Sequence, residues 1–154
     1  MYINGAWIQS SRTFPVFNPA NGEQIGEVVD GNRSDAGTAI AAAAAALPAW
    51  SALTAYERSD KLYSAHRLML ERRQQLAQLM TREQGKPLKA ALNEVKYAAD
   101  FLLWFAEEAK RVYGRTIPSS RGDQRFLVHR QPVGVVAAIT PWNYPVSMLT
   151  RKLA

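Results

Sequence analysis

An apolar run that ends in a proline-framed polar loop constrains this chain more than any other feature. Residues 133–139 have the sequence VGVVAAI, a short valine-rich segment without charge. Segments of this kind are typical of strands that are buried on both faces of a parallel sheet. The segment TPWNYP (residues 140–145) follows, and its second proline suits the first position of a helix. We therefore expect a strand, a tight loop and a helix, as in a parallel α/β sheet.

The loop TPWNYP is the main candidate for a functional site. Ligands of open α/β sheets bind at the carboxyl ends of the parallel strands, and the helix that follows directs its free N–H groups to the same place. Because two prolines restrict the loop, it would present Asn143 as a preorganised polar group and Trp142 as a flat apolar wall. The alternative is a proline-framed turn that buries Trp142 in the core, and the residues alone leave both open.

The sequence pattern divides the chain into four segments. Residues 1–31 contain short apolar runs separated by Asn-Gly and Asn-Pro turns, which predict β-hairpin arms. Residues 32–114 have helical spacing of apolar side chains. In residues 115–132 the pattern changes to alternation, which predicts a pair of half-buried strands. Residues 133–154 are the strand, loop and helix described above. The predicted fold class is therefore α/β.

Three helices are expected between the arms and the alternating segment. The first has an N-cap candidate at Ser34 and ends at Pro48. A capping box at Thr54 starts the second, which ends at Gly85 because a glycine followed by a proline stops a helix. The third ends near Tyr113. Six consecutive alanines in the first helix are explained by helix propensity alone.

Charge and hydropathy exclude several classes of partner. The net charge is +6, but basic residues alternate with acidic ones along the expected helices, which is typical of solvated helix faces. We therefore expect no nucleic-acid partner, although a basic helical nucleic-acid-binding protein stays an alternative. No segment reaches the roughly 18 apolar residues of a membrane span. The N-terminus lacks the pattern of a secretory signal, so the cytoplasm is the expected compartment.

The inventory of reactive side chains is small. The 154 residues contain no cysteine, which excludes a disulfide, a zinc-thiolate site and a cysteine nucleophile within them. There are two histidines, so we expect no metal site, and His66 is interpreted as a structural residue near the apolar face of the second helix. No Gly-x-Gly-x-x-Gly fingerprint occurs, so a dinucleotide would have to bind without that device.

Two motifs carry a resemblance to a known family. The motifs are EQGKP (residues 83–87) and PWNYP (residues 141–145). Their order and the sequence around them resemble the aldehyde dehydrogenase superfamily, and most closely its succinate-semialdehyde dehydrogenases. The likeness covers essentially the whole chain. It implies the N-terminal part of that fold, consisting of β-arms, a helical segment, and the first strand and helix of the parallel cofactor-binding sheet.

The resemblance also implies roles for individual residues. Members of the family oxidise an aldehyde to an acid with NAD or NADP, and a cysteine thiolate attacks the carbonyl. Asn143 corresponds to the donor that stabilises the oxyanion. Thr140, Pro141 and Trp142, together with Asn143, correspond to residues that lie along the cofactor. Arg151 corresponds to the residue that receives the distal carboxylate of a semialdehyde.

The position of Arg151 can also be judged from spacing. On a helix that starts near Pro145, Ser147, Met148 and Arg151 share one face. An arginine on an inward face of a site helix can bind a planar anion with two hydrogen bonds. The alternative is an ordinary surface arginine near the end of a helix.

The resemblance places the family's cysteine beyond these residues. We therefore interpret the chain as an N-terminal portion of such an enzyme, inactive alone, with a small-molecule aldehyde as substrate of the full-length form. That full-length form is expected to be a homo-oligomer, a dimer or a tetramer. The alternative is a non-catalytic assembly module that pairs with full-length aldehyde dehydrogenase subunits through exposed edge strands.

Overall fold

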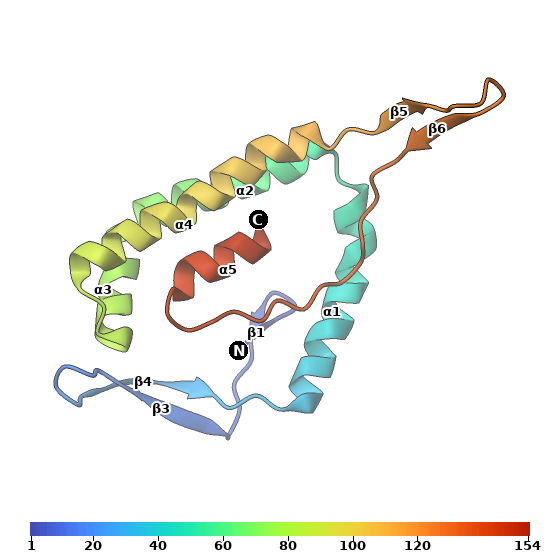
Figure 1. Cartoon of the computed structure of the whole chain (residues 1–154). Coiled ribbons are helices and arrows are strands. Elements are labelled where there is room, and N and C mark those ends of the chain that lie inside the picture. The colour runs from blue at the N-terminus through green and yellow to red at the C-terminus, as the bar shows by residue number, and fades with distance from the viewer.

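A computed structural model describes all residues, 1–154, as three separate hairpins and a helical body (Figure 1). The hairpins are antiparallel and pair β1 (Tyr2–Ile3) with β2 (Ala6–Trp7), β3 (Thr13–Phe17) with β4 (Gln24–Val29), and β5 (Arg115–Pro118) with β6 (Arg125–Val128). The helices are α1 (Arg33–Ala52), α2 (Ala55–Glu71), α3 (Arg73–Gln84), α4 (Leu88–Glu108) and α5 (Pro145–Leu153), with a short 3-10 turn η1 (Ala109–Arg111) after α4.

Helix α4 is the centre of the helical body. Helix α2 lies beside it along much of its length, and α3 and α5 pack against it as well (Figure 1). The buried face of α4 is rich in alanine, which lets the neighbouring backbones approach closely. Its buried residues are Ala91, Glu94, Val95, Ala98, Ala99, Leu102 and Ala106. The core therefore lies between α4 and the helices around it.

The predicted arms and helix signals are largely confirmed. Asn4 and Gly5 both have positive φ, as a tight two-residue hairpin turn requires. The capping box at Thr54 is present, and Gly85 ends α3 in the left-handed conformation. His66 is buried, with Nδ1 2.8 Å from the carbonyl oxygen of Ala99, as expected for a structural histidine.

Three predicted helix limits are wrong. The N-cap of α1 is Asn32, whose side chain accepts from the N–H groups of Ser34 and Asp35, so Ser34 already belongs to the helix. Pro48 does not end α1. The proline removes only one backbone hydrogen bond, and the helix continues past it to Ala52. The second predicted helix is divided at Arg72 into α2 and α3, a break that no glycine or proline marks in the sequence.

The expected burial of the later strands is also corrected. β5 and β6 form the predicted pair, but every residue of both strands is exposed because the hairpin projects away from the helices (Figure 1). The apolar run 133–139 forms no strand at all. Its side chains face solvent, with Val133 91% and Ile139 93% exposed. A strand needs a hydrogen-bonded neighbour, and none of the strands in residues 1–154 pairs with this run.

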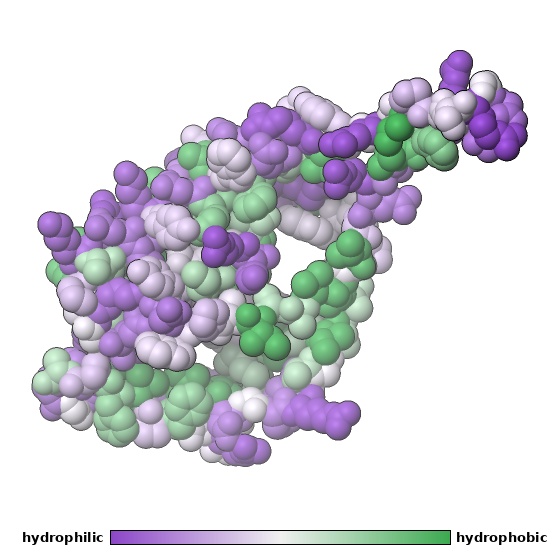
Figure 2. All heavy atoms as spheres, in the orientation of Figure 1, coloured by the Kyte–Doolittle hydropathy of each residue, from purple (hydrophilic) through white to green (hydrophobic).

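The chain exposes more surface than a compact monomer. Its accessible surface is 11575 Å², whereas a compact protein of this mass exposes about 7,800 Å². Hydrophobic residues gather along α1 and the nearby C-terminal segment (Figure 2). Ile40 and Trp50 of α1, and Val136, are among the exposed large apolar side chains. No single helix has the length and apolar character of a membrane span; α1 and α2 meet that test only as a pair bent by 119°.

Candidate functional site

The loop that precedes α5 presents its side chains to solvent. Trp142 is 81% exposed and therefore lies outside the core that residues 1–154 form. Thr140, Pro141 and Asn143 are exposed as well. No other group forms a hydrogen bond with the Asn143 side-chain amide, which leaves its donor available to a ligand. The sequence-predicted loop residues therefore lie together on one accessible segment.

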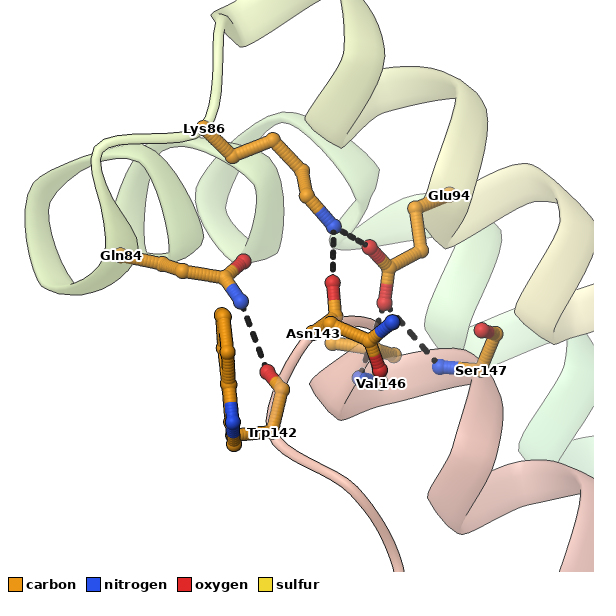
Figure 3. Close-up of polar contacts among 7 residues, drawn as sticks. All are labelled: Gln84, Lys86, Glu94, Trp142, Asn143, Val146 and Ser147. Carbon is orange, nitrogen blue, oxygen red and sulfur yellow. Dashed lines mark hydrogen bonds and ion pairs between the residues drawn. The ribbon is translucent and has the colours of Figure 1, made fainter.

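Two side chains where α3 ends and the turn to α4 begins hold the backbone of this loop (Figure 3). The Gln84 Nε2 donates to the carbonyl oxygen of Trp142 at 2.7 Å. The Lys86 Nζ donates to the carbonyl oxygen of Asn143 at 2.9 Å and lies 4.1 Å from the centre of the Tyr144 ring. Both residues belong to the EQGKP motif. The two motifs of the sequence are therefore parts of one contact, although they are separated by more than fifty residues.

A buried carboxylate connects this turn with α5. Glu94 lies on the buried face of α4, and its side chain is 1% exposed. One of its oxygens forms an ion pair with Lys86. The other accepts the N–H groups of Val146 at 3.1 Å and Ser147 at 3.3 Å (Figure 3). Because Tyr144 gives α5 no side-chain cap, Glu94 caps that helix from outside, and its negative charge favours the helix N-terminus.

Gly85 allows the turn that carries Gln84 and Lys86. Its φ is +73°, a conformation that glycine adopts without strain. A Cβ at this position would also lie 2.9 Å from Cγ of Pro19 in the turn between β3 and β4. The N-terminal arm therefore packs directly against the turn that holds the loop.

The spacing argument placed Arg151 on one face of α5 with Ser147 and Met148, but Arg151 does not lie on the face of α5 that is buried. That face carries Ser147 and Thr150, whereas Arg151 is exposed and Met148 half-buried. The reason is the direction in which α5 packs on α4, which periodicity alone does not give. The guanidinium lies 5.2 Å from the centre of the Phe101 ring, and no carboxylate pairs with it. An unpaired cation is thus accessible six residues after the start of the helix.

The sequence reasoning missed Gln84, Lys86 and Glu94 as site residues. A signal for Glu94 was present, because Ala91, Val95 and Ala98 surround it on one apolar helix face. A carboxylate in such a position is rarely buried unless it is paired. No three His, Asp or Glu side chains come close enough together to hold a metal ion.

Comparison with known proteins agrees with this geometry. The model of the aldehyde dehydrogenase family matches residues 7–154. The chain belongs to the aldehyde dehydrogenase family. It is 56% identical over 153 residues to a glutarate-semialdehyde dehydrogenase of Pseudomonas putida, covering 98% of this chain and 32% of the relative. It is 52% identical over 152 residues to a succinate-semialdehyde dehydrogenase (NADP(+)) of Escherichia coli, covering 97% of this chain and 32% of that protein.

Solved structures of aldehyde dehydrogenases share the fold. A succinate-semialdehyde dehydrogenase from Burkholderia pseudomallei superposes with a TM-score of 0.94 at 45% identity, covering 99% of this chain and 32% of that one. An aldehyde dehydrogenase from Brucella melitensis superposes with a TM-score of 0.93 at 51% identity, covering 97% of this chain and 32% of that one. The chain thus corresponds to the N-terminal part of the aldehyde dehydrogenase fold and spans about a third of the length of these relatives.

Proposed function

We propose that this chain supplies the oxyanion donor and part of the cofactor surface of an aldehyde dehydrogenase. The observation that carries the proposal is the Asn143 amide, which is exposed and without a partner on a loop whose backbone is held at two consecutive carbonyls. As a thiolate attacks an aldehyde, the carbonyl oxygen gains negative charge. A preorganised N–H donor at that oxygen stabilises the transition state more than the substrate, and therefore accelerates the reaction.

The loop also fits one side of a nicotinamide cofactor. Trp142 offers an exposed aromatic plane, and Thr140 and Pro141 extend the accessible segment beside it. NAD or NADP, when bound, supplies the hydride acceptor of the oxidation. Related proteins support this assignment: a 3,6-anhydro-L-galactose dehydrogenase was solved with bound NAP, and betaine aldehyde dehydrogenase of Staphylococcus aureus with NAD+. The helix N-terminus cannot bind the cofactor phosphates here, because Glu94 already occupies two of its N–H groups.

The substrate class that we propose is a short semialdehyde with a carboxylate at its far end. The names of the relatives, which act on succinate and glutarate semialdehydes, support this class. The chain's own support is Arg151, whose guanidinium has no carboxylate partner. A guanidinium matches a carboxylate with two parallel hydrogen bonds, so a semialdehyde could be held at one end while Asn143 meets its aldehyde end.

The first 154 residues alone should be inactive. They contain no cysteine to act as the nucleophile. Much of their apolar surface is also exposed, including the run 133–139 that has no neighbouring strand. The remaining two thirds of a full-length enzyme would cover this surface and pair with the run as the first strand of a parallel sheet. We expect such an enzyme to be a homo-oligomer in the cytoplasm, although relatives from rice, Arabidopsis thaliana and rat are named mitochondrial.

A second function is favoured by the projecting β5–β6 hairpin. All eight of its strand residues are exposed, and four of them are large apolar side chains: Ile117, Phe126, Leu127 and Val128. Such an edge can pair with another chain. The alternative function is therefore a non-catalytic module that pairs with full-length subunits, and co-purification of the 154-residue chain with a full-length relative would support it.

A hybrid enzyme tests the catalytic proposal. In the hybrid, residues 1–154 replace the aligned segment of the Pseudomonas putida glutarate-semialdehyde dehydrogenase. We expect the hybrid to reduce NAD or NADP with succinate or glutarate semialdehyde, and the 154-residue chain to show no turnover above a mock purification. A hybrid that folds and assembles but oxidises neither semialdehyde would contradict the proposal.

A further inference from the structure

Lys86 occupies the point where the turn, the buried carboxylate and the loop meet. Its Nζ donates to the Asn143 carbonyl oxygen at 2.9 Å, pairs with Glu94, and lies 4.1 Å from the centre of the Tyr144 ring. The side chain is 14% exposed. Its ammonium group is therefore fixed from three directions, which is unusual for a flexible lysine near a surface.

The Asn143 side chain has no such support of its own. Its amide forms no hydrogen bond and is exposed, so its position follows from the backbone that carries it. The backbone carbonyl oxygen of Asn143 accepts a hydrogen bond from Lys86. Since Glu94 also holds the first N–H groups of α5, Lys86 and Glu94 together fix the backbone on both sides of Tyr144. The direction in which Asn143 points is thus set from α4 through this ion pair.

We propose that Lys86 is a positioning residue for Asn143 and that the Lys86–Glu94 pair sets the geometry of the oxyanion donor. The inference rests on the proposed function, because it assigns Lys86 a kinetic role only if Asn143 is that donor. The role proposed for Lys86 requires no contact of its own with the aldehyde or the cofactor. It acts by holding one carbonyl oxygen, so that the amide of the same residue already points to the developing charge before the reaction starts.

Five variants of the hybrid enzyme test this role: Lys86→Met, Lys86→Arg, Asn143→Ala, the double variant Lys86→Met/Asn143→Ala, and the control Lys89→Met. Lys89 is exposed near the start of α4 and forms no ion pair. Because a small misplacement of a catalytic group has a large kinetic cost, Lys86→Met should lower kcat about 10- to 100-fold and change KM for the aldehyde much less. Lys86→Arg, which keeps a charged donor, should lose clearly less, and Lys89→Met should resemble the parent.

The double variant separates positioning from a general loss of structure. If Lys86 acts only through Asn143, the double variant should be no slower than Asn143→Ala alone, because the two effects share one route. A structural role would instead add its own loss. Equal kcat in Lys86→Met and the parent, or losses that multiply in the double variant, would overturn the inference.

Hydrogen exchange gives a second readout that does not depend on activity. In Lys86→Met the amides of residues 141–150 should exchange faster than in the parent, whereas the amides of α2 should exchange at the parent's rate. In the control variant Lys89→Met no amide of residues 141–150 should exchange faster. Unchanged exchange across 141–150 would refute the inference even if kcat fell. If Asn143→Ala leaves kcat unchanged, the proposed function fails, and the exchange result still decides whether Lys86 orders the loop.

Discussion

Replacing Glu94 by alanine removes the acceptor on which three groups depend. These are the ammonium of Lys86 and the N–H groups of Val146 and Ser147. Breaking a buried ion pair by removing one partner typically costs about 3–5 kcal/mol, because the other charge loses its compensation. Lys86 keeps the Asn143 carbonyl and the Tyr144 ring as partners, so the lower end applies. We expect Glu94→Ala to lower the free energy of unfolding by about 3 kcal/mol.

Glu94→Gln should cost less than the alanine variant. Its amide oxygen can still accept from Val146 and Ser147, but its NH2 group then faces the Lys86 ammonium, donor against donor, so the pairing with Lys86 is lost. Since a neutral hydrogen bond contributes roughly half as much as a charge-assisted one, a loss of about 1.5 kcal/mol is expected. The order of stability should therefore be parent, Gln variant, Ala variant.

Urea unfolding of the 154-residue chain, followed by circular dichroism of the helices, measures these differences. The matched control is Glu107→Ala on the same helix, because Glu107 is exposed and forms no ion pair. Its effect should stay within about 0.5 kcal/mol. A Glu94→Ala variant as stable as this control would refute the claim that the carboxylate joins α4 to α5.

Three further predictions concern the turn, a cap and the substrate. A non-glycine residue in the left-handed conformation costs about 1–2 kcal/mol. Gly85→Ala should lower the free energy of unfolding by more than that, because the new Cβ also meets Pro19, and urea unfolding measures the difference. Hydrogen bonds from Thr54 lower the pKa of Glu57, so the stability from this cap is present above the ordinary pKa and is lost as the pH falls through the lowered one. An NMR titration of Thr54→Ala should show a Glu57 pKa that rises only part of the way to its ordinary value, because alanine removes the hydroxyl donor but keeps the backbone N–H, which is the larger cause. In the hybrid, Arg151→Gln should cut kcat/KM for succinate semialdehyde about 10- to 150-fold and spare butanal, with Arg151→Lys between; equal losses on both aldehydes would remove the semialdehyde assignment.

Local sequence signals predicted the elements that depend on local chemistry. The Asn4–Gly5 turn, the capping box at Thr54 and the stop at Gly85 each rest on a few neighbouring residues, and the structure confirms them. Pro145 at the start of α5 belongs to the same class. Such signals do not depend on what packs against the segment.

Features that depend on distant partners could not be predicted in the same way. The break at Arg72 has no local signal, and the Arg73 Nε there donates to the carbonyl oxygen of Leu92 on α4 at 2.9 Å. The run 133–139 has the composition of a buried strand, but a strand forms only where a neighbour is present. The exposed face of Arg151 follows from how α5 lies on α4, which periodicity cannot give.

The candidate site was predicted only in part, because some of its residues are brought together by contacts between distant segments. The loop around Asn143 was expected from the prolines and the order of elements; the structure shows it exposed just before α5, but with no strand preceding it. The residues that hold the loop, Lys86 and Glu94, are more than forty residues away in the sequence. Their role became visible only when the fold brought the two motifs together.

The kcat of Asn143→Ala in the hybrid enzyme tests the central claim most directly. With saturating semialdehyde and cofactor, loss of an oxyanion donor should lower kcat by about 10²–10³-fold. The melting temperature and the affinity for NAD or NADP should stay close to those of the parent, because the Asn143 amide has no partner within the fold. An unchanged kcat per folded molecule, or a sharp fall in melting temperature without one in kcat, would show that Asn143 only shapes the loop.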